Sequence, residues 1–222
     1  MIFRQPENGF LRKTAMNVTQ NVVLIHGLYT GPVIMRVLGK RLSEQGFVPH
    51  YFAYATTKQN LHQHALALAN WLREKQLVPC HFVAHSLGGL LLQHLADVAP
   101  ELFQARVVTL GSPHRGSLTA KWVHGFQAAL LGGAWQDALD GSLPEKPLPV
   151  LCGNIAGCAE NGVGKLVLKL PQPNDGTVAL EETRLPESVP LLVHCGHTDL
   201  LFNKDVAQQT GYFLQNGCFQ AA

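Results

Sequence analysis

The chain alternates between short runs that are apolar at nearly every position and longer segments whose apolar residues recur at helical spacing. The first run, residues 21–25, has no polar residue after Asn21. This is typical of a strand buried on both faces of a parallel sheet. Five later runs predict five further strands, at residues 47–54, 80–85, 106–110, 148–155 and 189–195.

The segments between these runs predict helices. The first segment begins at Pro32, which suits the first turn of a helix, and stops at Gly46. The second presents one apolar face made of Leu61, Ala65, Leu68 and Leu72. Two further helices are expected at residues 87–99 and 203–216. Together these elements predict an α/β fold with a doubly wound, mostly parallel sheet of about six strands and helices on both faces.

A length of 222 residues predicts a single domain. Residues 1–19 show no periodic pattern and are expected to be irregular. The net charge of +2 and the lack of a Lys/Arg run predict no binding to nucleic acid. The start of the chain has no apolar core of signal-peptide length, and no run is long enough to span a bilayer. We therefore expect a cytoplasmic protein without a transmembrane segment.

Five cysteines, an odd number without a C-x-x-C pair, predict free thiols in a reducing compartment. A bridge between Cys152 and Cys158 is the alternative. Neither residues 62–64 nor residues 194–197, which hold two histidines each, offer a third and fourth ligand at a recognisable spacing. We expect no metal. The loop after the first strand lacks a glycine-rich nucleotide signature, so no cofactor is expected either.

The clearest motif is Ala84-His85-Ser86-Leu87-Gly88, where the third strand turns into a helix. It matches the nucleophile elbow G-x-S-x-G, with Ala84 in place of the first glycine. A serine at a strained bend with positive φ needs small residues two positions away on either side. The pattern is short and can arise by chance, so the rest of the chain must supply the partners of Ser86.

Two backbone N–H groups are candidates for an oxyanion hole. His26-Gly27-Leu28 follows the first strand, and Gly27 is expected to bend the backbone so that the Leu28 N–H faces the same point as the Leu87 N–H. The alternative is an ordinary turn in which His26 is a polar support.

The base candidate is His197, in the loop after the last predicted strand. His194 is less suitable, because it falls within that strand. Asp175 lies in the connection between the last two strands, where an acid could orient His197. Its setting, Asn-Asp-Gly, is also an ordinary turn signal. Glu160 is the reserve candidate for the acid.

These stretches together resemble the α/β-hydrolase superfamily, and within it small bacterial lipases and esterases. Residues 25–27, 84–89, 111–117, 174–178 and 196–197 carry the resemblance. Residues 111–117 look like the G-T-P-H-x-G-S loop of lipases, with Ser112 where threonine is common. The resemblance implies that His114 is structural and that the sheet is reduced, lacking the first two strands of the full fold.

Residues 117–147 form an insertion between the fourth and fifth strands, where lipase-like enzymes carry a cap. Its apolar positions recur every fourth residue and predict a helix that ends at Gly132-Gly133. They are Leu118, Trp122, Phe126 and Leu130. This stripe could form a lid over the site, or it could simply pack the helix onto the sheet. Tyr29, Trp122 and Phe126 are candidate substrate-binding residues.

The leading interpretation is a serine esterase or lipase that acts on a small ester with an apolar acyl chain. Ser86 is the expected nucleophile, His197 the base and Asp175 the acid. An acyltransferase or a thioesterase would use the same machinery, and a non-catalytic binding module would share the fold. The sequence does not indicate the oligomeric state.

Overall fold

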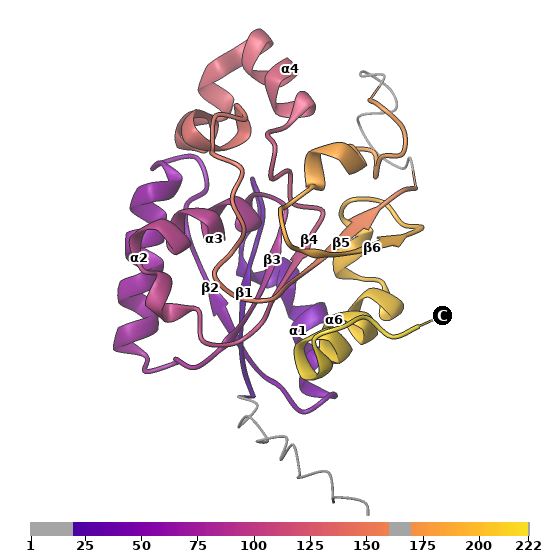
Figure 1. Cartoon of the computed structure of the whole chain (residues 1–222). Coiled ribbons are helices and arrows are strands. Elements are labelled where there is room, and N and C mark those ends of the chain that lie inside the picture. The colour runs from indigo at the N-terminus through magenta and orange to yellow at the C-terminus, as the bar shows by residue number, and fades with distance from the viewer. Residues whose placement is uncertain (1–19, 160–169, 222) are drawn as a thin grey trace, which may run out of the picture.

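The computed structural model describes residues 20–159 and 170–221. Its centre is a six-stranded sheet in the order β2-β1-β3-β4-β5-β6, in which every neighbouring pair is parallel (Figure 1). The strands are β1 Asn21–Ile25, β2 Val48–Phe52, β3 His81–His85, β4 Val107–Leu110, β5 Cys152–Gly157 and β6 Val189–Val193. The predicted α/β class and the reduced, six-stranded sheet are confirmed.

Several predicted strand boundaries differ from the structure by one to four residues, and two of the differences bear on the argument. The fifth strand begins at Cys152 rather than at residue 148. Pro149, which lies before it, has no N–H to donate to a ladder inside the sheet. The sixth ends at Val193, so His194 follows the strand instead of lying within it. The expected irregular segment, residues 1–19, and the reserve acid Glu160 lie outside the described residues.

Helices cover both faces of the sheet because alternate strand residues point to opposite sides. Val23 and Ile25 face a core shared with α2 (Leu61–Glu74) and α3 (Leu87–Val98). Val22 and Leu24 face a second core shared with α1 (Arg36–Ser43) and α6 (Lys204–Asn216). Figure 1 shows α2 and α3 on one side and α1 and α6 on the other.

All five cysteines are free thiols, as predicted. The alternative bridge between Cys152 and Cys158 is excluded by β5 itself. Cys152 is the first residue of this strand and Cys158 follows its last. An extended chain rises about 3.3 Å per residue, which places the two roughly 20 Å apart, and a disulfide needs Cα atoms within about 7 Å.

The helical part of the insertion, residues 117–147, forms a cap beyond the carboxyl ends of the strands, and the rest of the insertion runs back toward the start of β5 (Figure 1). It contains α4 (Leu118–Gln127) and the short turns η3 (Ala128–Leu130), η4 (Gly132–Ala134) and η5 (Trp135–Leu139). The predicted helix is interrupted at Gln127, whose φ and ψ are −153° and 87°. Its apolar stripe faces outward, since Phe126 is 82% exposed and Leu118, Trp122 and Leu130 are each more than 40% exposed. The interpretation in which this stripe packs onto the sheet was therefore wrong.

No helix within residues 20–159 and 170–221 is both long enough and apolar enough to cross a membrane.

Candidate active site

Ser86 occupies the sharp turn between β3 and α3. Its φ and ψ are 54° and −121°, a conformation that is costly for any residue with a Cβ atom. The surrounding backbone holds it there: the Ser86 N–H donates to Leu110 O on β4 at 2.9 Å, and the Gly89 N–H donates to Ser86 O at 3.0 Å. The turn has the geometry of a nucleophile elbow.

The glycines around Ser86 are required by close approach. A Cβ added at Gly88 would lie 2.8 Å from Ile25 O, and one at Gly27 would lie 2.9 Å from Ser86 Cβ. The φ of Gly27 is outside the left-handed region, so its backbone conformation does not by itself require a glycine. Gly27 instead lets the loop after β1 approach Ser86.

The structure brings Asp175 and His197 together. His197 Nδ1 lies 2.7 Å from Asp175 Oδ2, and the His197 N–H donates to Asp175 O at 3.0 Å. The other carboxylate oxygen, Oδ1, accepts the N–H groups of Thr177 at 3.0 Å and Val178 at 2.7 Å. Asp175 is 1% exposed. With Nδ1 bonded to the carboxylate, Nε2 is the ring nitrogen that can accept a proton from a hydroxyl.

The turn interpretation of Asn-Asp-Gly also holds. Asn174 Oδ1 accepts the Gly176 N–H at 2.9 Å, and Gly176 has a φ of +86°. The turn and the contact between Asp175 and His197 are therefore compatible, since the turn presents the carboxylate at the carboxyl edge of the sheet.

His85 supports the His197 loop, a contact that the sequence analysis missed. Its Nε2 lies 3.1 Å from His197 O, and the two rings are 4.7 Å apart between centroids. Burial, together with a smaller effect of the nearby His197, lowers the pKa of His85 to about 3. The ring is therefore neutral, and Nε2–H donates to the carbonyl. The only sequence signal was a histidine at the end of a buried strand.

Three other histidines have structural contacts. His26 is buried and stacks on Tyr54 with ring centroids 4.5 Å apart, and the Tyr54 hydroxyl donates to His26 O at 2.9 Å. His114 is buried between Gln93 and Thr109, and burial lowers its pKa to about 3. His194 contacts the Cys158 thiol.

Ser86, His197 and both candidate oxyanion residues line one cavity of about 350 Å³. Much of its wall is apolar and comes from the elbow and the cap. The apolar residues are Leu28, Ile34, Leu87, Pro113, Ala120, Val123, Leu131, Leu139 and Val178. Tyr29 also lines the cavity, as expected of a substrate-binding residue. Trp122 and Phe126 do not, because α4 turns Ala120 and Val123 inward and the stripe outward.

A buried carboxylate that the sequence analysis passed over joins the cap to this site. Glu182 is 8% exposed, and its two oxygens accept the N–H groups of Leu118 and Ala179. Burial raises its pKa, with a further contribution from the nearby Asp175. Glu182 thus caps α4 from the segment that carries Asp175.

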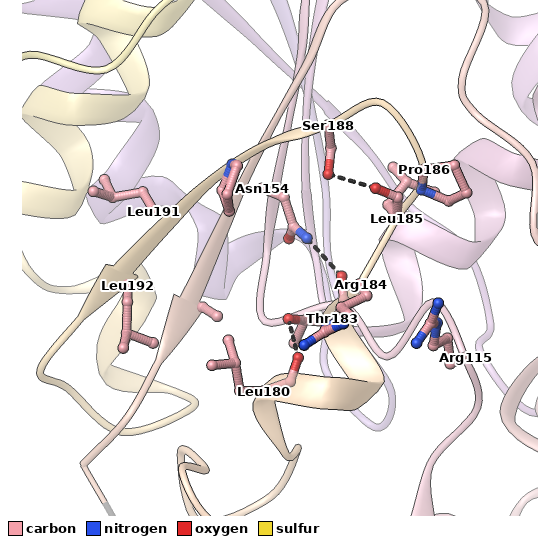
Figure 2. A pocket seen from close by; sticks show the side chains of 12 residues that line it. Arg115, Asn154, Leu180, Thr183, Arg184, Leu185, Pro186, Ser188, Leu191 and Leu192 are labelled. Carbon is pink, nitrogen blue, oxygen red and sulfur yellow. Dashed lines mark hydrogen bonds between the residues drawn. The ribbon is translucent and has the colours of Figure 1, made fainter.

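A larger cavity of about 480 Å³ lies elsewhere, between β5, β6 and the segment that precedes β6 (Figure 2). Arg115 and Arg184 at this cavity are both paired with Glu181. The Asn154 amide, also in its wall, donates to Thr183 O. None of the predicted site residues lines it, so we place the candidate active site in the smaller cavity. The described part of the chain holds no group of three or more His, Cys, Asp or Glu side chains placed to bind a metal.

No protein-family model and no curated protein sequence matches the chain. Solved structures do. The mature lipase BlEst2 of Bacillus licheniformis is 20% identical with a TM-score of 0.68, and the match covers 89% of this chain and 91% of the lipase. Carboxylesterase CesB (YbfK) of Bacillus subtilis is 13% identical, with a TM-score of 0.63 and coverage of 90% and 85%. The thioesterase RedJ of Streptomyces coelicolor is 16% identical, with a TM-score of 0.56 and coverage of 86% and 84%.

The parallel sheet, the strained serine after β3 and these structural matches agree with one another. The chain has the α/β-hydrolase fold, and its structure resembles those of bacterial lipases and carboxylesterases.

Proposed function

We propose that the protein is a serine hydrolase that cleaves carboxylic esters through an acyl-enzyme intermediate. One observation carries the proposal: the strained Ser86 shares a cavity with His197, whose Nδ1 is bonded to the buried Asp175. A nucleophile, a base and a group that orients the base are the parts that such chemistry requires.

In the proposed reaction Ser86 Oγ attacks the ester carbonyl carbon while His197 Nε2 takes the hydroxyl proton. The Asp175 carboxylate holds the ring in the correct tautomer and stabilises the imidazolium. The carbonyl oxygen becomes an oxyanion, which the N–H groups of Leu28 and Leu87 stabilise. The tetrahedral intermediate then expels the alcohol, which takes the proton from His197, and leaves an acyl group on Ser86.

Deacylation repeats these steps with water as the nucleophile. His197 removes a proton from water, and the hydroxide attacks the acyl carbon. Collapse of the second tetrahedral intermediate releases the carboxylic acid and returns the proton to Ser86. Every proton that leaves a reactant is carried by His197, so no cofactor is needed.

The wall of the cavity supports an apolar acyl chain as the preferred group. A cavity of about 350 Å³ is at the lower end of the range typical of small-molecule sites. The cap contributes four of the nine apolar residues, namely Ala120, Val123, Leu131 and Leu139. We therefore propose that α4 forms a lid over the acyl group, with Ala120 and Val123 as its inner face.

Thioester hydrolysis is a second candidate, because the same residues would attack a thioester carbonyl. The structural likeness to the thioesterase RedJ favours keeping it. Comparing an acyl thioester with the oxygen ester of the same acyl chain separates the two, since only the leaving group differs.

The decisive experiment compares wild type with Ser86→Ala on a chain-length series of nitrophenyl esters, with labelling by a serine-directed phosphonate alongside. Ser43→Ala, an exposed serine on α1, is the matched control. Loss of Ser86 is expected to lower kcat by roughly 10⁴-fold or more and to abolish labelling, whereas the control behaves as wild type.

Equal rates in wild type and Ser86→Ala would exclude Ser86 as the nucleophile. Labelling of Ser86 without ester cleavage would mean that the site is competent and the substrate class is wrong. Neither cleavage nor labelling would favour a non-catalytic binding module.

A further inference from the structure

One side chain joins the cap to the loop that carries Leu28. This loop, residues 27–31, is called the oxyanion loop below. The Tyr29 hydroxyl donates a hydrogen bond of 2.6 Å to the carbonyl oxygen of Leu130, 101 positions further along the chain. The Tyr29 side chain is exposed, with 61% of the residue accessible. Burial of the ring therefore does little to fix it, and the hydroxyl contact is its main attachment to the cap.

The backbone of Tyr29 is held in an unfavourable conformation. Its φ is 56°, in the left-handed region that a bulky residue rarely adopts. Such a conformation persists only where neighbouring contacts impose it. Two contacts do so: the Tyr29 N–H donates to Thr56 Oγ1 at 3.2 Å, and the Thr30 hydroxyl donates to Gly27 O at 2.8 Å.

The acceptor of the Tyr29 hydroxyl is itself fixed. The Gly133 N–H donates to Thr57 O at 2.9 Å. A Cβ at Gly132 would lie 2.2 Å from Thr57 O, so this part of the cap rests directly on the loop between β2 and α2. Tyr29 bonds to both, through its N–H to that loop and through its hydroxyl to the cap.

We propose that Tyr29 is a positioning residue for the oxyanion hole. It fastens the oxyanion loop to the cap and to Thr56, and thereby holds the Leu28 N–H at the place where the oxyanion forms. The role rests on the proposed function and requires no contact between the Tyr29 hydroxyl and the substrate. It also makes the geometry of the oxyanion hole depend on the position of the cap.

The test is Tyr29→Phe, which removes the hydroxyl and keeps the ring that lines the cavity. We expect kcat to fall about tenfold, less than the 10²–10³-fold loss caused by removing an oxyanion donor outright, with KM within twofold of wild type. Binding of a trifluoromethyl ketone, whose serine adduct places a charged oxygen in the hole, should weaken by the same factor as kcat/KM. Tyr212→Phe on α6 is the matched control.

A second pair of variants tests the other attachment. Thr56→Val removes the acceptor of the Tyr29 N–H and should also lower kcat, whereas Thr56→Ser keeps the hydroxyl and should restore most of it. If Tyr29→Phe does not fold, the two Thr56 variants test the proposal instead. Equal kcat in Thr56→Val and Thr56→Ser would overturn the positioning role of Tyr29.

The outcomes separate this role from the proposed function. Wild-type kcat and ketone affinity in Tyr29→Phe, with Ser86→Ala inactive, would overturn the positioning role alone. A raised KM at unchanged kcat would do the same and would indicate a direct substrate contact. If wild type neither cleaves esters nor reacts with the phosphonate, both proposals fail.

Discussion

Replacing Asp175 by asparagine removes one charge and leaves the shape of the side chain almost unchanged. Thr177 and Val178 donate backbone N–H groups to one carboxylate oxygen, and the amide oxygen of asparagine would keep these two bonds. The amide nitrogen would then face His197 Nδ1, where the carboxylate oxygen now lies at 2.7 Å. An NH₂ group cannot accept a proton there, so the ring is forced into the tautomer with its proton on Nε2.

That tautomer cannot take a proton from Ser86. Misplacing it in a Ser-His-Asp site costs about 10⁴-fold in kcat, or about 5 kcal/mol of transition-state stabilisation at 1.36 kcal/mol per factor of ten. We expect a loss of this size for Asp175→Asn in the nitrophenyl ester assay, with Tm close to that of wild type. Asp205→Asn, an exposed position on α6, is the control.

Asp175→Ala serves as the contrast. It leaves the half-buried Thr177 N–H and the buried Val178 N–H without their acceptor. An unsatisfied buried group costs about 1–3 kcal/mol, so this variant should lower Tm as well as activity. Activity within tenfold of wild type in Asp175→Asn would refute the assignment of Asp175 as the acid that orients His197. A low Tm in both variants would show that the carboxylate is mainly structural.

Three further predictions concern close packing at Gly27, the dependence of stability on pH, and the part of the cavity wall that α4 forms. Gly27→Ala places a methyl group 2.9 Å from Ser86 Cβ, so we expect a loss of kcat of at least tenfold at little cost in KM, measured by ester kinetics. His85 and His114 have pKa values lowered to about 3 by burial, whereas the unfolded chain takes up these protons near pH 6.5. Burying these two rings in the neutral form therefore costs nothing above about pH 6.5, and the folded state loses stability as the pH falls from there towards 3. Thermal melts should show Tm decreasing over this range, and less steeply in His114→Gln. Val123→Trp fills part of the cavity and should shift the preferred ester to a shorter acyl chain; an unchanged chain-length profile would show that α4 does not border the acyl group.

The sheet could be predicted because strands buried on two faces leave a direct record in the sequence. In β1 every residue after Asn21 is buried, and the apolar run ends where the strand ends. The start of β5 was harder to predict. Leu148 is buried although it lies before the strand, and Pro149 is the sequence signal that separates it from the strand. Apolar composition therefore reports burial and not sheet pairing, and a proline is a signal against pairing only in a strand that has neighbours on both sides, as β5 does.

In the candidate site, too, some features could be predicted from the sequence and others could not. Asp175 and His197 were singled out by their place in the chain order, and they lie together because the carboxyl ends of parallel strands meet at one edge. The contact of His85 with His197 O and that of Tyr29 with Leu130 O join residues more than 100 positions apart. They end on backbone carbonyls, which every residue has, so no pattern of side chains could predict them.

The apolar stripe of α4 faces outward, and the insertion divides into two parts that are held in different ways. Helix α4 buries only Ala120. It is held by hydrogen bonds that include Leu118 N–H to Glu182 and the Thr119 hydroxyl to Thr177 O, and by the His124 ring, which stacks on Trp135 with centroids 4.0 Å apart. The part that follows packs into the core, with Leu131, Ala134, Ala138 and Leu139 buried. The spacing of apolar residues indicated a helix but did not indicate which of its faces packs against the protein. The apolar stripe was expected to face inward, and it lies on the outer face.

This asymmetry determines what the cap can do. Removing the whole insertion would delete core residues and unfold the protein, whatever the role of α4. Detaching α4 alone breaks a few hydrogen bonds, each contributing about 0.5–1.5 kcal/mol net, and separates the His124 ring from Trp135. It also exposes one alanine together with the partly buried Val123. Local opening at such a cost lies well below the free energy of global unfolding. If the cap is a lid, α4 is therefore its moving part, and residues 131–139 are the fixed support to which Tyr29 attaches through the adjacent Leu130.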